Sequence, residues 1–192
     1  MASMRGLASL LETVHLTALG VWVGAVGMTA AMAAVIFPQM NHLDPRLPGF
    51  SAYPSEHGVI AAGWVMARVF MILDWAQLAT AGLALLALIV RVVIRGGAPM
   101  RWTGVRLALT LASAGILLWY LLAVAQPMNA DLVGFWQAAQ AGEVERADAL
   151  RASFDARHPS ASRALGSLMV AALVTILVSG LAATAPPRRV DR

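Results

Sequence analysis

The sequence predicts an all-α membrane protein built as a bundle of four transmembrane helices. Of the 192 residues, 59% are hydrophobic and only 12% are charged, and the mean hydropathy is +0.72. Soluble domains carry roughly a quarter charged residues. The apolar residues are also gathered into four long blocks, each near the roughly 20 residues that cross a bilayer core. We therefore expect a single domain over residues 1–192, embedded in the lipid bilayer.

Each apolar block predicts one span. The blocks lie at about residues 7–37, 59–94, 105–128 and 164–185. Because the hydrocarbon core offers no water, the backbone of each span must satisfy its own hydrogen bonds, and within a single segment only a helix does so. Four helices follow from this constraint.

The first and third spans finish on similar phrases, IFPQMN at residues 36–41 and AQPMNA at residues 125–130. Proline lacks a backbone N–H, and the residue before it is biased away from the helical region. The asparagine that follows tolerates turn conformations. We interpret both phrases as boundary markers that end the first arm of a helical hairpin.

The long segment between the third and fourth spans predicts an additional helix over residues 131–158. Its apolar residues recur at spacings of three and four, and opposite charges such as Glu143 and Arg146 fall three residues apart. This pattern is typical of an amphipathic helix. We expect it to cap the outer end of the bundle as a packed connector, with a position on the membrane surface as the alternative.

Arginine alone supplies the 14 basic residues, and its distribution predicts the orientation. With four spans, both termini share one side with the short link at residues 95–104. That side carries eight arginines and the opposite side carries six, so the positive-inside rule favours cytoplasmic termini. The lysine-free, alanine-rich composition is typical of a GC-rich bacterial genome, which predicts the bacterial inner membrane. Arginines spread over loops in this way do not indicate a nucleic-acid partner.

Glu12 and His15 lie three residues apart near the start of the first span. A neighbouring carboxylate can orient an imidazole for a proton relay or for metal support. The alternative is an ordinary interhelical hydrogen bond of His15. In the second span Asp74 shares a face with Gln77, and a charge inside a span is costly unless it is paired. We expect Asp74 to face the bundle and to meet Arg163 or Tyr120.

These residues and three others on the outer side form the candidate functional polar cluster. Its members are Glu12, His15, Arg68, Asp74, Gln77, His158 and Arg163. A separate set of small residues, Gly20, Gly24 and Gly27, makes a smooth face on the first span. Such faces let helices approach closely. We expect this one to pack inside the bundle, with a contact to a second copy as the alternative.

The sequence predicts no bound metal and no other cofactor. His42, His57 and His158 fall on the outer side and are weak candidates for copper, which accepts imidazole and thioether ligands. There is no cysteine, so cysteine-ligated metal and thiolate chemistry are excluded. No phosphate loop, nucleophile elbow or other catalytic motif is present. We expect a protein that is not an enzyme.

Four phrases of the chain resemble a known family. They are Trp22-Val23-Gly24 and Phe37-Pro38 in residues 14–40, Gln126-Pro127-Met128, and the stretch Phe154-Asp155-x-x-His158 before the last span. In this order they resemble the transmembrane protein 205-like family, also called bacterial domain of unknown function 4149. The resemblance implies four transmembrane helices and an outer motif around His158, with no established activity. The first span is also similar to that of the copper-resistance D-type membrane family, which would imply copper or haem handling.

Three functions follow as hypotheses. The first is a non-enzymatic structural or interaction module of the inner membrane that binds a membrane or envelope protein through its outer cap. The second is a copper- or haem-handling protein. The third is a small-solute or proton carrier that uses Asp74 with Glu12 and His15. Because four helices enclose little space, this carrier would act as a homo-oligomer.

Overall fold

The computed structural model describes residues 2–54, 56–94 and 101–184, and the regular structure in these residues is helical. The elements, in order, are α1 (Ala2–Leu43), η1 (Pro48–Phe50), α2 (His57–Ile94), α3 (Arg101–Trp119), η2 (Tyr120–Ala125), α4 (Gln126–Ala141) and α5 (Val144–Thr184). The turn η1 is a 3₁₀-helix and η2 is a π-helix. Since α3, η2 and α4 follow one another without a break, the described chain forms four long rods. Each is apolar and long enough to cross a membrane, as predicted.

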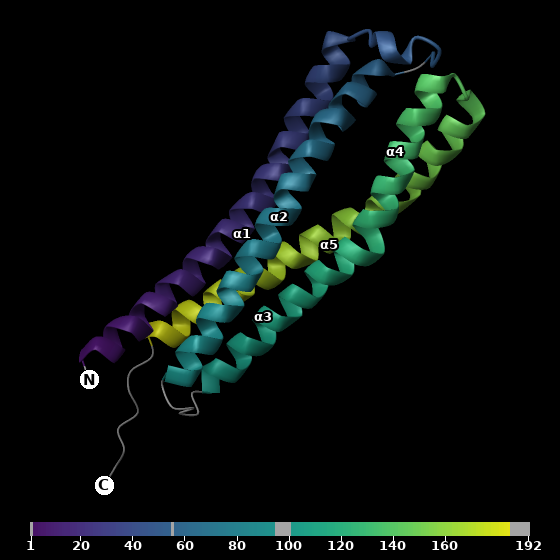
Figure 1. The fold of residues 1–192 in the computed structure, drawn as a ribbon. Helices are drawn as coiled ribbons and strands as arrows, with labels where there is room; N and C mark the ends of the chain where they lie inside the picture. Colours follow the sequence, from purple (N-terminus) through teal and green to yellow (C-terminus); the bar gives the residue numbers. More distant parts are fainter. Residues whose placement is uncertain (1, 55, 95–100, 185–192) are drawn as a thin grey trace.

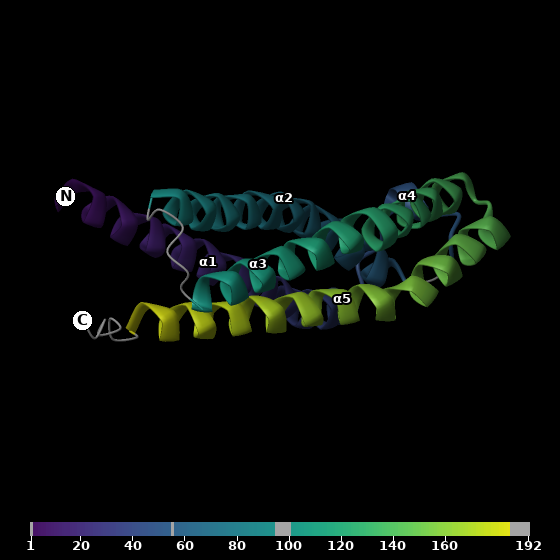
Figure 2. The same cartoon turned by 90° about the horizontal axis from the view of Figure 1, so that it is seen from below.

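The molecule is elongated, with the rods gathered at one end and separated into two hairpins at the other (Figure 1). We call the first the terminal end, because α1 begins there and α5 finishes there. We call the other the hairpin end, where α1 turns into α2 and α4 turns into α5. Figure 2 shows α3 and α5 side by side toward the terminal end, and α4 and α5 joined at the hairpin end.

Both predicted proline stops are wrong, because the helices continue through them. Pro38 lies inside α1, which runs on to Leu43, and Pro127 lies in the first turn of α4. Before Pro127 the π-helix has already changed the spacing of the backbone hydrogen bonds from four residues to five. The N–H that proline lacks therefore falls where the regular α-helical hydrogen bonds are already interrupted. Pro38 sits on the exposed side of α1. One proline costs about 3 kcal/mol in a helix, which the flanking helical turns can offset.

The predicted extra amphipathic helix is also not formed. The segment instead divides between α4 and α5, which meet at Gly142 with a φ of 75°. This left-handed conformation ends a helix and favours glycine. The predicted apolar row therefore faces inward from two antiparallel helices, and Phe135, Ala139 and Ala147 are buried in it.

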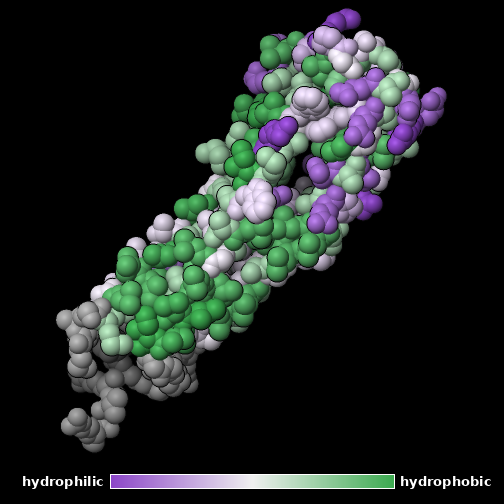
Figure 3. Space-filling view, viewed as in Figure 1, coloured by the Kyte–Doolittle hydropathy of each residue, from purple (hydrophilic) through white to green (hydrophobic). Residues whose placement is uncertain are grey.

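Two apolar clusters hold the rods together. The first lies among α1, α2, α3 and α5 and includes Leu19, Trp22, Leu117 and Leu168. The second, which we call the hairpin cluster, consists of Phe50, Tyr53, Ile60, Phe135, Ala138, Ala139 and Ala147, with Trp136 and Leu150 packed against it. In the space-filling view the body toward the terminal end is strongly hydrophobic, whereas hydrophilic side chains gather over the α4–α5 hairpin (Figure 3).

The prediction that Gly20, Gly24 and Gly27 pack inside the bundle is wrong. A methyl group added at any of these glycines would meet no neighbouring atom within 4 Å, and Gly20 and Gly24 are exposed. The opposite side of α1, carrying Leu19 and Trp22, enters the core instead. Large apolar side chains bury more contact area than glycines, so they decide which face turns inward.

The close helix approach occurs at Gly58, at the start of α2. A methyl group there would lie 2.7 Å from the Met40 carbonyl oxygen and 3.0 Å from the Asn41 Cα. Both atoms belong to the backbone of α1, which cannot move away like a flexible side chain. Gly58 therefore sets the spacing of α1 and α2 at the hairpin end.

We expect Gly58→Ala to lower the free energy of unfolding by about 1–3 kcal/mol, the usual effect of overpacking a tight contact. Thermal unfolding of the purified protein in detergent measures the change. Gly20→Ala is the matched control, and it should be neutral or slightly stabilising because its surroundings are open. Equal effects of the two substitutions would contradict the close approach.

Candidate functional site

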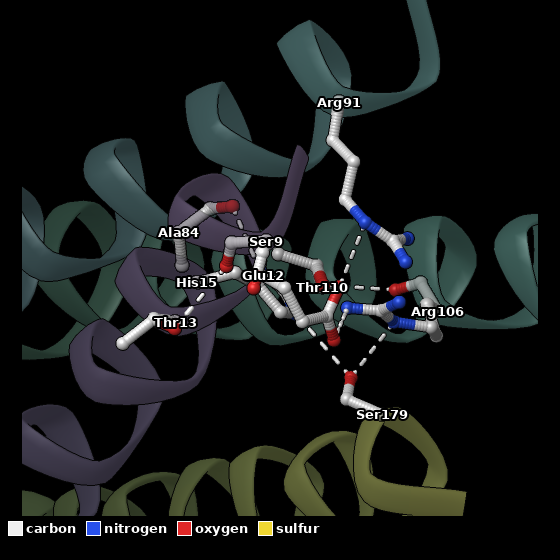
Figure 4. Close-up of polar contacts among 9 residues, drawn as sticks. All are labelled: Ser9, Glu12, Thr13, His15, Ala84, Arg91, Arg106, Thr110 and Ser179. Atoms are coloured by element: carbon white, nitrogen blue, oxygen red, sulfur yellow. Dashed lines mark hydrogen bonds and ion pairs between the residues drawn. The ribbon is translucent and has the colours of Figure 1, made fainter. Parts of the chain in front are cut away.

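A buried polar network lies near the terminal end, where four helices converge (Figure 4). Its members are Glu12 and His15 of α1, Arg91 of α2, Arg106 of α3 and Ser179 of α5. We call these five residues the terminal network. His15, Arg106 and Ser179 are fully buried, and Arg91 is nearly so. Charged side chains buried to this extent within spans are rare and demand partners.

The Glu12 carboxylate joins the two arginines. Its Oε2 atom lies 2.9 Å from Arg91 Nε, and its Oε1 atom accepts a hydrogen bond of 2.8 Å from Arg106 Nη2. One carboxylate thus connects α1 with both α2 and α3. The bond from Arg106 is a charge-assisted hydrogen bond, roughly twice as strong as a neutral one, whereas the contact with Arg91 is an ion pair.

The network continues from Arg106 to His15 through a serine. Arg106 Nε donates to Ser179 Oγ at 2.9 Å, and Ser179 Oγ lies 3.3 Å from His15 Nε2. The other ring nitrogen, His15 Nδ1, lies 2.9 Å from the Ala84 carbonyl oxygen. A carbonyl oxygen only accepts, so Nδ1 carries a proton. In the neutral ring Nε2 then accepts from the serine hydroxyl, which completes a chain of polar contacts from Arg106 to Ala84.

His15 is oriented by Ala84 and Ser179, which belong to other helices, while its neighbour Glu12 bonds to the arginines. Of the two roles considered for His15, the structure contains the interhelical hydrogen bond. Sequence reasoning missed Arg91, Arg106 and Ser179. The two arginines were counted as loop charges that set the topology, although both fall within the ends of apolar blocks. Glu12 is the sole acidic residue before Asp44, and this isolation was a usable signal that it has basic partners.

Three hydroxyl groups lie deeper in the bundle. Thr110, Ser113 and Thr175 are fully buried, and each donates to the carbonyl oxygen four residues earlier in its own helix. These bonds satisfy the hydroxyls without a partner helix. They make the interior polar but do not tie helices together.

A second polar contact lies closer to the middle of the bundle. Trp22 Nε1 donates to Gln77 Oε1 at 3.1 Å, which links α1 to α2. Within the described residues, Gln77 Nε2 and Asp74 Oδ1 are buried and have no hydrogen-bond partner. Asp74 is close enough to interact electrostatically with Tyr120, one of its two predicted partners. The polar groups at this level, like Arg106 Nη1 of the terminal network, are thus incompletely hydrogen-bonded within the described residues.

The three remaining predicted site residues lie on the surface. Arg68, His158 and Arg163 are exposed. Arg163 Nε donates to the Pro159 carbonyl oxygen at 3.2 Å instead of meeting Asp74, and the His158 ring lies 5.8 Å from the Phe154 ring. The structure therefore divides the predicted cluster into the buried Glu12–His15 region, the Asp74–Gln77 level and scattered surface residues.

The outer histidines do not converge. His57 Nδ1 accepts from the Leu47 backbone N–H at 3.0 Å, and His57 Nε2 lies 3.0 Å from the Tyr53 carbonyl oxygen, so both nitrogens hold the loop before α2. His42 and His158 are exposed. Across residues 2–54, 56–94 and 101–184, no group of three or more His, Cys, Asp or Glu side chains could hold a metal ion.

Comparison with protein-family models, curated proteins and solved structures finds no match to this chain. The resemblance to the transmembrane protein 205-like family accordingly stays a prediction. The four long apolar helices identify the chain as a multi-pass membrane protein in contact with a lipid bilayer.

We expect Glu12→Gln to lower the free energy of unfolding by about 3–5 kcal/mol, because it leaves buried arginine charge without its carboxylate. Thermal or denaturant unfolding in detergent measures the loss. Glu143→Gln removes the carboxylate of an exposed pair, in which Arg146 and Glu143 are 68% and 49% exposed, and should change stability by less than about 1 kcal/mol. If Glu12→Gln were as mild as this control, the network would not hold the bundle.

Proposed function

We propose that the chain is a non-enzymatic interaction module of the bacterial inner membrane, with the terminal end in the cytoplasm and the hairpin end outside. This orientation is the one favoured by the arginine count over the sequence, in which Arg91 and Arg106 are counted at the ends of their spans. The observation that carries the proposal is a tryptophan- and arginine-bearing face of α2 that continues beyond the lipid. The partner is another membrane or envelope protein.

Exposed tryptophans suggest where the lipid ends. Trp75 lies 16 residues from Arg91 along α2, and Trp119 lies 13 residues from Arg106 along α3. At 1.5 Å per residue these separations are roughly 20–24 Å from the same ion-paired level. Both side chains are at least half exposed, and tryptophan gathers at membrane–water interfaces. Together they support an outer boundary near Trp75 and Trp119.

The exposed face of α2 extends past this boundary. Trp64, Arg68 and Trp75 follow one another at spacings of four and seven residues, which places them on one side of a helix. We call these three residues the Trp–Arg face. Trp64 is 52% exposed and lies roughly 16 Å beyond Trp75 along the helix. Tryptophan and arginine are the residues most enriched at the energetic centres of protein interfaces. A protein partner would cover Trp64 where lipid no longer does.

The hairpin end presents this face on a fixed scaffold. Tyr53 donates to Asp148 at 2.6 Å, and Arg151 forms an ion pair with Glu56, so the α1–α2 connection is bonded to α5. Trp64 itself packs edge-on against Trp136 of α4, with ring centroids 5.7 Å apart. A surface ordered before binding loses less entropy when a partner arrives.

Site-specific photo-cross-linking in cells tests the proposal. A photoreactive residue at Val65 or Arg68 should give a discrete protein adduct, because both positions border Trp64 on the exposed part of α2. Leu177 of α5 is 66% exposed within the predicted lipid zone and serves as the control. Substituting Trp64 by Ala should reduce the adduct at Arg68 several-fold. Adducts at none of the α2 positions would refute the docking role.

The copper or haem alternative gains no support from the described residues, since His15 and His57 already use both ring nitrogens.

The carrier alternative is favoured by one observation. Asp74 and Gln77 hold buried polar atoms without hydrogen-bond partners at the level between the terminal network and the predicted outer boundary. Asp74 forms no ion pair within the described residues, so proton exchange there would break none.

If the chain carries protons, Asp74→Asn should reduce proton flux into proteoliposomes by at least about tenfold, because the amide cannot take up a proton at neutral pH. A pH-sensitive dye enclosed in the vesicles measures the flux. Asp155→Asn changes an exposed carboxylate of the hairpin end and should leave the flux unaltered. Identical flux for the native chain and Asp74→Asn would exclude Asp74 from this role.

A further inference from the structure

Two buried polar atoms lie without partners on one face of α2. Asp74 and Gln77 are three residues apart in this helix, a spacing that places their Cβ atoms about 5–6 Å from each other. Gln77 is fully buried, and its Nε2 atom has no hydrogen-bond partner within the described residues. The Oδ1 atom of Asp74 is also buried and unpartnered there. Since unbonded buried polar atoms cost free energy, the pair indicates a ligand that is not part of the described chain.

Trp22 determines which end of the Gln77 amide is free. The indole N–H of Trp22 only donates, so the amide oxygen Oε1 of Gln77 must face it, at 3.1 Å. The amide nitrogen Nε2 is therefore the end that turns away from Trp22. An amide nitrogen only donates, so the ligand atom that meets it must accept a hydrogen bond.

Asp74 requires the opposite property of the ligand. Its ionised carboxylate only accepts, and it forms no ion pair within the described residues. A cation would suit Asp74 but would lie beside the N–H donors of Gln77. An anion would suit Gln77 but would be repelled by Asp74. A hydroxyl group accepts through its oxygen and donates through its hydrogen, so it matches both atoms.

The side chains around the pair do not supply this group. Trp22, Leu73 and Leu117 belong to the apolar cluster that surrounds this level of the bundle. Tyr120 is only 5% exposed and interacts electrostatically with Asp74, yet its hydroxyl bonds to neither unpartnered atom. Tyr120 also begins η2, and π-helical turns are frequent at functional sites. A third polar side chain therefore stands at the same level as the pair.

We propose that Asp74 Oδ1 and Gln77 Nε2 together bind one hydroxyl group, which donates to the carboxylate and accepts from the amide. Two sources supply this chemistry, a water molecule and a small polyol such as glycerol. Buried waters make about three hydrogen bonds to groups that otherwise have none, which suits Asp74 and Gln77 with Tyr120 nearby. The site does not rest on the carrier role, because a bound hydroxyl group satisfies these atoms whether or not a proton is carried.

Solid-state NMR of the full, uniformly ¹⁵N-labelled chain in deuterated lipid bilayers tests the proposal. Magnetisation transfer to the Gln77 side-chain amide is measured from water in one sample and from the carbon-bound protons of ¹³C-labelled glycerol in a second. The exposed amides of Gln137 and Gln140 set the mixing time at which an accessible group responds. The backbone N–H of Leu168, fully buried in the apolar cluster, should not respond at this time.

Transfer to Gln77 from water alone assigns the site to a water molecule. Transfer from glycerol in the second sample shows that the site admits a polyol. If neither source reaches the Gln77 amide at the mixing time at which Gln137 and Gln140 respond, the proposal is overturned.

Variants of Asp74 separate this site from the carrier role. Asp74→Leu removes the acceptor, so transfer to the Gln77 amide should fall severalfold. Asp74→Asn keeps an oxygen acceptor of the same shape and should retain the transfer, although it is the variant expected to lose proton flux. Asp155→Leu removes an exposed carboxylate of the hairpin end and should leave the transfer unchanged. Full transfer in Asp74→Leu would overturn the proposal; if this variant does not fold, the measurement on the native chain decides.

Discussion

The structure depends on one carboxylate. Glu12 forms ion pairs with Arg91 and Arg106, and Arg106 in turn bonds to Ser179. A single residue of α1 is thus connected to α2, α3 and α5. Lipid tails are as apolar as leucine, so apolar side chains alone give helices little reason to choose one another in a membrane. The charged contacts of Glu12, which connect four helices, favour one arrangement of these helices over others. They also fix which residues of the four rods lie at the same height.

The two ends of the molecule are held together by different physics. At the terminal end the rods converge on the ion pairs of Glu12 with Arg91 and Arg106. Charges buried within apolar helices need such partners because lipid tails offer none. At the hairpin end, α1 and α2 separate from α4 and α5 and are rejoined by edge-to-face aromatic pairs and by the ion pair of Arg151 with Glu56. Both side chains of this ion pair are partly exposed. Charged contacts therefore join the rods at the terminal end, and aromatic packing joins them at the hairpin end.

The spans could be predicted because hydropathy and length are properties of a single segment, and a helix follows from backbone bonding in lipid. Other features depend on which segments contact one another in three dimensions. A single sequence does not show these contacts. Pro38 was interpreted as a stop, although the local cost of one proline is small beside several helical turns. The side of α1 that carries Gly20 was assigned to the interior because period alone does not distinguish lipid from protein. Arg91 and Arg106 were missed because partners that pair across 79 and 94 positions leave no local pattern.

The spacing of the terminal network along the chain has a consequence for biosynthesis. Glu12 is made first, Arg91 and Arg106 follow much later, and Ser179 stands close to the end of the last rod. The four-helix junction therefore cannot close until the residues up to Ser179 have left the ribosome. Until then a carboxylate and later two guanidinium groups must be housed by the insertion machinery or by lipid headgroups near the surface. The junction is therefore completed by α5, after the other three rods have been synthesised.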